Sequence, residues 1–236
     1  MKIQARSKPR HAGCGLAERA FVVWVLLALA MLAPVAALLD GPFPIFTVIW
    51  LAVPLIAVLC SRNARQVGWH LVPAPEFFKV TAACLGAMLL LAALVEPWSH
   101  TYQLLLQKAT AGPHPDTTFA WLVRYPGISG WAGMLAYSGM VTILGEELFF
   151  RGWLLQLLRR RTGRTRAVVL QAVLFTLPQL LPALLMPVPQ ALLYSVIYSW
   201  LTVGIIGGWA AERTASFFPS LLSATLLNFV LTLTVL

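Results

Sequence analysis

The sequence predicts an all-α membrane protein, a polytopic bundle of about seven transmembrane helices. Of its 236 residues, 59% are hydrophobic and only 11% are charged, and the mean hydropathy is +0.80. A soluble domain normally carries about a quarter charged residues. Several apolar runs approach the roughly 20 residues that a helix needs to cross about 30 Å of hydrocarbon. Composition and run length therefore place most of the chain in a bilayer.

Glycine, proline and basic clusters separate the apolar runs from one another. The expected spans lie at about 20–39, 45–60, 80–95, 131–158, 167–185, 191–211 and 220–236. Short turns are expected at 40–44, 159–166, 186–190 and 212–219, and longer loops at 61–79, in part an amphipathic helix, and at 96–129. We therefore divide the chain into a basic tail (1–19), an N-terminal membrane region (20–130) and a C-terminal core (131–236).

The basic residues indicate how the spans are oriented. The formal net charge is +9, which in a soluble protein would suggest binding to nucleic acid. With seven spans and the N-terminus in the cytoplasm, only Lys108 and Arg124 fall on the outer side, and Arg151 lies within the fourth span. Because cytoplasmic loops of membrane proteins are rich in Lys and Arg, this distribution supports a multi-pass protein with a cytoplasmic N-terminus. We expect a lipid bilayer and no nucleic acid as its partner.

The stretch "GEELFFRG" places Glu146, Glu147 and Arg151 at membrane depth on the fourth span. A charged side chain near the bilayer centre costs at least about 2.5–3.5 kcal/mol on insertion scales and usually faces a bundle interior. Glu147 and Arg151 are four residues apart, so they share a helix face and can pair. Glu146 points about 100° away from Glu147, and no basic residue lies three or four positions from it. The alternative is that all three residues form a structural charge cluster.

Other polar side chains lie on the later spans. Gln171 and Gln179 are expected on roughly one face of the fifth span, and Asn228 lies on the seventh. The sixth span carries Tyr194, Ser195, Tyr198 and Ser199. Isolated polar residues in membrane helices most often form hydrogen bonds between helices. Gly204 and Gly208 have the small-xxx-small spacing of closely packed helices.

From about residue 135 to the C-terminus, the chain resembles the bacterial family of CAAX-protease and bacteriocin-processing intramembrane proteases (CPBP, Abi), which includes the eukaryotic CAAX prenyl proteases. The first family motif, Glu-Glu-x-x-x-Arg, is matched by Glu146, Glu147 and Arg151. The second is Phe-x-x-x-His and the third is His-x-x-x-Asn or His-x-x-x-Asp. The resemblance implies a bacterial inner-membrane location and a membrane-anchored peptide or protein substrate.

The chain departs from both later motifs. Phe175 is followed by Gln179 where the family has histidine, and Ala224 precedes Asn228 where the family has its other histidine. The resemblance implies Glu146 as the base that activates water, Glu147 with Arg151 as a supporting pair, and Asn228 as an oxyanion donor. A Glu and Gln pair is also similar to the working dyad of soluble glutamic peptidases. Gln179 would then orient the water and donate to the oxyanion.

The sequence therefore predicts a glutamic-type intramembrane endopeptidase that cleaves a membrane-anchored peptide, such as a C-terminal sorting tail. No cofactor and no metal are expected, because carboxylate and amide oxygens without histidine make a poor zinc site. Two alternatives remain. An inactive pseudoprotease would bind a peptide or partner without cutting it, in bacteriocin immunity or as a chaperone. A small transporter would use the glutamates as a proton relay, with Pro178 and Pro182 interrupting the fifth span.

Overall fold

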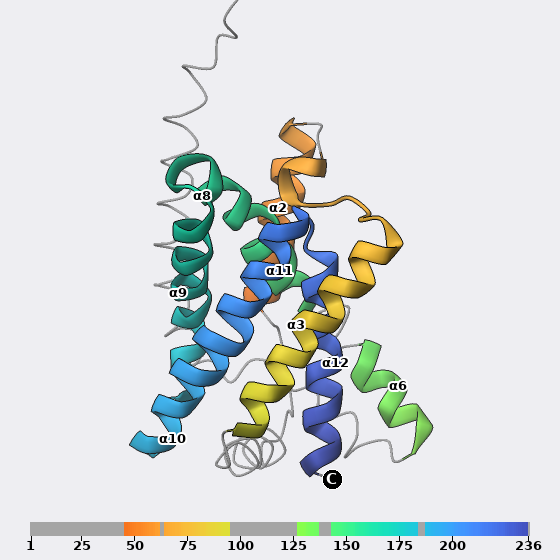
Figure 1. Cartoon of the computed structure of the whole chain (residues 1–236), viewed down its shortest axis with the longest axis vertical. Coiled ribbons are helices and arrows are strands. Elements are labelled where there is room, and N and C mark those ends of the chain that lie inside the picture. The colour runs from red at the N-terminus through yellow and green to blue at the C-terminus, as the bar shows by residue number, and fades with distance from the viewer. Residues whose placement is uncertain (1–44, 62–63, 95–126, 137–142, 184–186, 236) are drawn as a thin grey trace, which may run out of the picture. The chain divides into compact units, whose positions relative to one another are not determined.

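The computed structural model describes residues 45–61, 64–94, 127–136, 143–183 and 187–235. Within these ranges every regular element is a helix or a helical turn, which confirms the all-α class (Figure 1). The tail at 1–19 and the first expected span at 20–39 lie outside the described residues, as does most of the loop expected at 96–129. The number of transmembrane helices therefore stays a prediction.

The first described elements are α2 (Ile45–Ser61), the short 3-10 turn η1 (Ala64–Val67) and α3 (Ala74–Leu94). α2 coincides with the second expected span. α3 begins earlier than the expected span at 80–95, because the sequence after Pro73 is suited to a helix start. Proline is tolerated in the first helical turn, and Glu76 adds a carboxylate there, where the helix dipole favours negative charge.

Two described helical runs lie in or near the fourth expected span, 131–158. The first is α6 (Ile128–Ala136). A second helical run starts at α7 (Leu144–Glu146) and continues as the π-helix η3 (Glu147–Leu154) and as α8 (Leu155–Thr162). The link between α6 and α7 lies outside the described residues, so a single span at 131–158 is not tested. The acidic motif lies at the junction of α7 and η3.

The basic turn expected at 159–166 is shorter than predicted. Arg159, Arg160 and Arg161 belong to the last turn of α8, where cations are stabilised by the negative end of the helix dipole. Gly163 follows with a φ of 83°, a left-handed conformation that glycine adopts without steric cost. The next helix, α9 (Arg164–Ala183), begins directly after it. One glycine is therefore enough to reverse the chain.

α9 runs through Pro178 and Pro182 without a break, so the interruption expected at these prolines is wrong. A proline removes one intrahelical hydrogen bond, but packing against neighbouring helices compensates for that loss. The helix ends before the break expected at 186–190. The next helix starts at Val188, directly after Pro187, so residues 188–190 of the expected break are helical.

The last two helical runs complete the core. α10 (Val188–Leu192), the π-helix η4 (Leu193–Ile206) and α11 (Gly207–Thr214) follow one another directly. α12 (Phe218–Val235) begins after a turn in which Ala215 adopts a left-handed φ of 54°. η4 packs along α9, while α3 packs against α12 and η4 (Figure 1). η3, which carries most of the acidic motif, packs against α2, η1, α8, α9 and α11.

The close helix packing predicted from the small residues is confirmed. A Cβ atom added to Gly204 would lie 2.9 Å from the Cβ of Ala172 on α9. A Cβ atom added to Gly208 would lie 2.5 Å from Oε1 of Gln171, one residue earlier on the same helix. Both distances are shorter than a normal van der Waals contact. These two glycines therefore let η4 and α11 approach α9 more closely than larger residues would allow.

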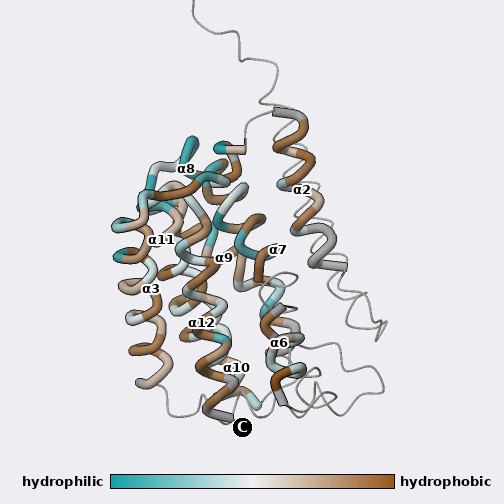
Figure 2. The backbone as a smooth tube through the Cα atoms, turned by 90° about the vertical axis from the view of Figure 1, so that its right-hand side faces the viewer, coloured by the Kyte–Doolittle hydropathy of each residue, from teal (hydrophilic) through white to brown (hydrophobic). Residues whose placement is uncertain are grey.

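Two helical stretches are long and apolar enough to cross a membrane within the described residues, Ala74–Ala93 and Val188–Thr214. Trp50–Leu59 and Phe218–Leu231 are shorter apolar helices. Large apolar side chains are exposed on several helices, among them Leu59, Leu90 and Leu192. Hydrophilic residues gather at the α8 end, and hydrophobic residues follow the length of α2 and α12 (Figure 2). Exposed apolar surface on this scale is typical of lipid-facing helices.

Candidate active site

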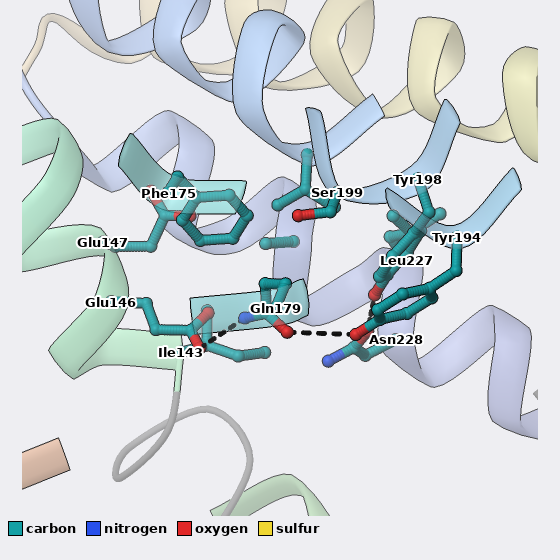
Figure 3. A pocket seen from close by; sticks show the side chains of 12 residues that line it. Ile143, Glu146, Glu147, Phe175, Gln179, Tyr194, Tyr198, Ser199, Leu227 and Asn228 are labelled. Carbon is teal, nitrogen blue, oxygen red and sulfur yellow. Dashed lines mark hydrogen bonds between the residues drawn. The ribbon is translucent and has the colours of Figure 1, made fainter. Parts of the chain in front are cut away.

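A cavity of about 150 Å³ lies where α7, η3, α9, η4 and α12 meet (Figure 3). Its polar lining comes from four parts of the chain that are distant in sequence. The polar residues that line it are Glu146, Glu147, Gln179, Tyr194, Tyr198, Ser199 and Asn228. The apolar residues are Ile143, Phe175, Val203, Ala224 and Leu227. Four of the five residues predicted to be catalytic, Glu146, Glu147, Gln179 and Asn228, therefore line one cavity, and the fifth, Arg151, does not.

Glu146 and Gln179 are in direct contact. Nε2 of Gln179 donates a hydrogen bond to Oε1 of Glu146 over 3.3 Å. Glu146 ends α7 and is only partly buried, so its carboxylate faces the cavity from the first helix of the motif. Gln179 reaches the same point from α9 (Figure 3). The two members of the predicted dyad thus meet within the reach required of a base and its orienting group.

Two tyrosines of η4 contact the two amides. The hydroxyl of Tyr194 donates to Oε1 of Gln179 over 3.0 Å. The hydroxyl of Tyr198 donates to Oδ1 of Asn228 over 3.2 Å. The sequence indicated both tyrosines only as helix–helix hydrogen-bonding groups. Their spacing of four residues on one helix was the signal that could have placed them together at the site.

Glu147 and Arg151 form the pair that their spacing predicts. Nη1 of Arg151 lies 2.6 Å from Oε1 of Glu147, and the two side chains are 0% and 1% exposed. Nη2 of Arg151 also donates to the backbone carbonyl of Val203 over 2.7 Å. The guanidinium carbon lies 4.5 Å from the centre of the Phe175 ring, a cation–π contact. The pair is therefore almost fully buried and links η3 to η4 and α9.

The packing around Arg151 explains a glycine of α11. A Cβ atom added to Gly207 would lie 3.0 Å from Nε of Arg151 and 2.7 Å from Oγ of Ser220. A side chain at this position would therefore compete with the guanidinium for space. The glycine-rich start of α11 thus serves the buried charge pair as well as the close approach to α9.

Two of the elements that carry polar residues of the cavity, η3 and η4, are π-helical. η3 holds Glu147 and Arg151, and η4 holds the two tyrosines. In η4, Oγ1 of Thr202 donates to the carbonyl of Ile197, five residues earlier, over 2.7 Å. A π-helix is wider than an α-helix and is frequently found at functional sites. This irregular backbone has no periodic signal in the sequence and was not predicted.

Two described polar residues, Gln171 and His70, do not line the cavity. Gln171 is fully buried beside Gly208 and has no hydrogen-bond partner for either amide atom among the described residues. Of the four histidines, only His70 lies in the described part of the chain, and it does not line the cavity. The described residues contain no group of three or more His, Cys, Asp or Glu side chains that could hold a metal ion.

A carboxylate and two amides that converge on a small cavity inside a helical bundle have the features of a hydrolytic site in a membrane protein. Residues 128–230 match the family model described as Type II CAAX prenyl endopeptidase Rce1-like. This match confirms the resemblance found in the sequence. Comparisons with curated proteins and with solved structures find no match.

The matched segment contains the whole acidic motif, Gln179 and Asn228, whereas α2, η1 and α3 precede it. Rce1-like proteases act on membrane-anchored protein substrates. The match therefore supports a membrane-embedded endopeptidase of the CPBP kind. The catalytic roles of the individual residues stay predictions.

Proposed function

We propose that the protein is a glutamic-type intramembrane endopeptidase that hydrolyses a peptide bond in a membrane-anchored substrate. The observation that carries this proposal is the 3.3 Å contact between Gln179 and Glu146 in a cavity that Asn228 also lines. The cavity of about 150 Å³ has room for a water molecule and one carbonyl group. The proposed location is a bacterial inner membrane, with several spans and a cytoplasmic N-terminus.

The proposed reaction uses Glu146 as general base. Its carboxylate takes a proton from water while the water oxygen attacks the carbonyl carbon of the scissile bond. The carbonyl electron pair moves onto oxygen, and the amide N–H groups of Gln179 and Asn228 donate hydrogen bonds to this oxyanion. When the intermediate collapses, the C–N bond breaks and Glu146 returns the proton to the leaving nitrogen. The products are a carboxylic acid and an amine, and the enzyme is restored.

Glu147 and Arg151 have a supporting role in this proposal. Both are almost fully buried, and their charges are matched at 2.6 Å, so neither is available to move a proton without breaking the pair. The pair instead fixes η3 against η4 through the carbonyl of Val203. Glu146, one residue earlier, is thereby held at the edge of the cavity.

The test is peptide cleavage by purified protein in proteoliposomes. Probes are an internally quenched single-span peptide with a C-terminal tail and a peptide that ends in a prenylated CAAX sequence. We expect Glu146→Gln and Gln179→Ala to lower kcat by about 10²- to 10⁴-fold, the usual range for loss of a base or oxyanion donor. Gln171→Met, a change at a buried glutamine of the same helix, should cleave like the wild type. Cleavage by both Glu146→Gln and Gln179→Ala at the wild-type rate would rule out the dyad.

A pseudoprotease is the second candidate, because Ala224 lines the cavity at the position where the family has a histidine. The double variant Gln179→His with Ala224→His restores the family residues and separates the two functions. An active glutamic enzyme requires that the wild type cleaves a probe and that Glu146→Gln does not. If only the histidine-restored variant cleaves, the wild type is a binding protein. In that case Glu146→Gln should keep full function in cells.

A further inference from the structure

The two amides at the cavity can serve as hydrogen-bond donors in only one of their two orientations. A primary amide presents two N–H donors on one side and a carbonyl acceptor on the other. Rotated by 180°, Gln179 or Asn228 would point an oxygen at a carboxylate or at an oxyanion, and the interaction would become repulsive. An enzyme that depends on amides therefore needs neighbours that fix their orientation.

Gln179 is fixed at both ends of its amide. The carboxylate of Glu146 can only accept, so the Gln179 nitrogen must face it, as it does at 3.3 Å. The Gln179 oxygen then faces Tyr194, whose hydroxyl donates to it over 3.0 Å. The three groups form a directed chain from phenol to amide to carboxylate. Hydrogen bonds in such a chain polarise one another, which strengthens the amide as a donor.

Asn228 has a matching arrangement. Tyr198 donates to its Oδ1 over 3.2 Å, and the amide nitrogen lies toward Gln179, away from Tyr198 (Figure 3). Tyr194 and Tyr198 are four residues apart on η4, with rings stacked 5.5 Å apart at 28°. The ring contact holds the two phenols side by side, one directed at α9 and the other at α12. One helix, η4, thus supplies a hydrogen bond to the amide oxygen of each proposed oxyanion donor.

We propose that Tyr194 and Tyr198 are positioning residues that hold the amides of Gln179 and Asn228 with their N–H groups toward the reacting carbonyl. The proposal rests on the proposed function, because it assigns the tyrosines to the same reaction. Neither phenol takes part in proton transfer. Each acts through the amide to which it donates.

The test uses Tyr194→Phe and Tyr198→Phe, which remove the hydroxyl groups and keep the stacked rings. With the quenched single-span peptide in proteoliposomes, we expect each variant to lower kcat by about tenfold, the worth of one well-placed hydrogen bond, with KM changed less than twofold. Thr176→Val is the control, because it removes a hydroxyl from the same α9–η4 interface that does not contact either amide. A purely structural role would lower thermal stability without this division between kcat and KM.

A double-mutant cycle tests which amide each tyrosine serves. In the Gln179→Ala background, Tyr194→Phe should lower kcat much less than it does in the wild type, whereas Tyr198→Phe should lower kcat as before. In ¹⁵N-glutamine-labelled protein, the side-chain amide resonances of Gln179 should shift in Tyr194→Phe and stay in place in Tyr198→Phe. This measurement needs no substrate, so it reads the positioning contact even without cleavage.

The outcomes separate this proposal from the proposed function. If Glu146→Gln abolishes cleavage but both Phe variants keep the wild-type kcat, the positioning role is wrong and the glutamic mechanism stands. If Glu146→Gln cleaves normally, the mechanism fails and the catalytic role of the tyrosines fails with it. An unchanged Gln179 resonance in Tyr194→Phe would also overturn the proposal.

Discussion

Glu147 and Glu146 are neighbours in the sequence, but their surroundings differ. Glu147 is 1% exposed and forms a 2.6 Å pair with Arg151, which is itself enclosed by a carbonyl and an aromatic ring. Glu146 faces a cavity and is met by one neutral amide at 3.3 Å. The charge of Glu147 is neutralised by Arg151, whereas the carboxylate of Glu146 can still accept a hydrogen bond from a water molecule in the cavity. The comparison teaches that one motif can hold a structural charge and a reactive charge one residue apart.

The largest expected effect concerns the reactive charge. Glu146→Gln keeps the shape of the side chain and removes the base, so kcat should fall by about 10²- to 10⁴-fold. The free energy of unfolding should change by less than about 1 kcal/mol, because the carboxylate is partly exposed and forms a neutral contact. Cleavage rates and denaturant unfolding in detergent micelles measure the two quantities. A large loss of stability would place Glu146 with the structural pair instead.

Removing one partner of the buried pair of Glu147 and Arg151 should instead lower the stability of the protein strongly. Arg151→Ala leaves Glu147 buried without its partner and frees the carbonyl of Val203, so we expect a loss of about 3–5 kcal/mol in unfolding free energy. The same denaturant measurement checks it. The double change Arg151→Met with Glu147→Met should recover part of the stability, because no charge then remains unpaired. A stable Arg151→Ala protein would mean that the pair is not fully enclosed.

Disturbing the close backbone contact at Gly152 should lower the unfolding free energy less than breaking the charge pair. A Cβ atom at Gly152 would lie 2.5 Å from the backbone oxygen of Val67, so Gly152→Ala forces the two segments apart. We expect a loss of about 1–3 kcal/mol in unfolding free energy. Gly86→Ala on α3 is the matched control, because no atom lies within 4 Å of its added Cβ. That change should be neutral or stabilise by up to about 1 kcal/mol.

The smallest expected effect concerns Gln171, the glutamine of α9 that does not line the cavity. Gln171 is fully buried with neither amide atom partnered among the described residues. Gln171→Met has a similar volume and removes the desolvated amide, so stability should be unchanged or higher by about 1 kcal/mol. Thermal unfolding in detergent is the measurement. A clear loss of stability in Gln171→Met would contradict this expectation and would mean that the amide of Gln171 forms a stabilising hydrogen bond.

The parts of the fold that depend on hydropathy and turn residues could be predicted from the sequence. α2, α9 and α12 lie close to the expected spans, because runs of apolar residues bounded by glycine, proline or arginine are local signals. A partial amphipathic helix was expected within 61–79, but its continuity with the following span, which makes α3 begin at Ala74, was not predicted. The π-helical segments were missed because a local change to i→i+5 backbone hydrogen bonds has no signature in the residue pattern.

The site was predictable where spacing or family likeness applied. Pairing of Glu147 with Arg151 followed from a separation of four residues, and the contact between Glu146 and Gln179 followed from the order of the family motifs. The tyrosine contacts could not be predicted, because they depend on how η4 is rotated against α9 and α12. That rotation is decided by long-range packing, such as the contact of Gly204 with Ala172, which the sequence does not encode locally.

Gly152 and Gly68 identify a point where three distant stretches of backbone cross. Gly68 has a φ of 65°, and a Cβ atom there would lie 3.5 Å from Cα of Gly152 and 3.4 Å from the carbonyl of Ala215. Oγ of Ser216 donates to the carbonyl of His70 across the same junction over 2.8 Å. One of the three stretches precedes the family segment at 128–230. A fragment limited to residues 128–230 would therefore lack the contacts that Gly68 and His70 make with Gly152, Ala215 and Ser216. We expect a fragment that folds on its own to include the turn at 64–70.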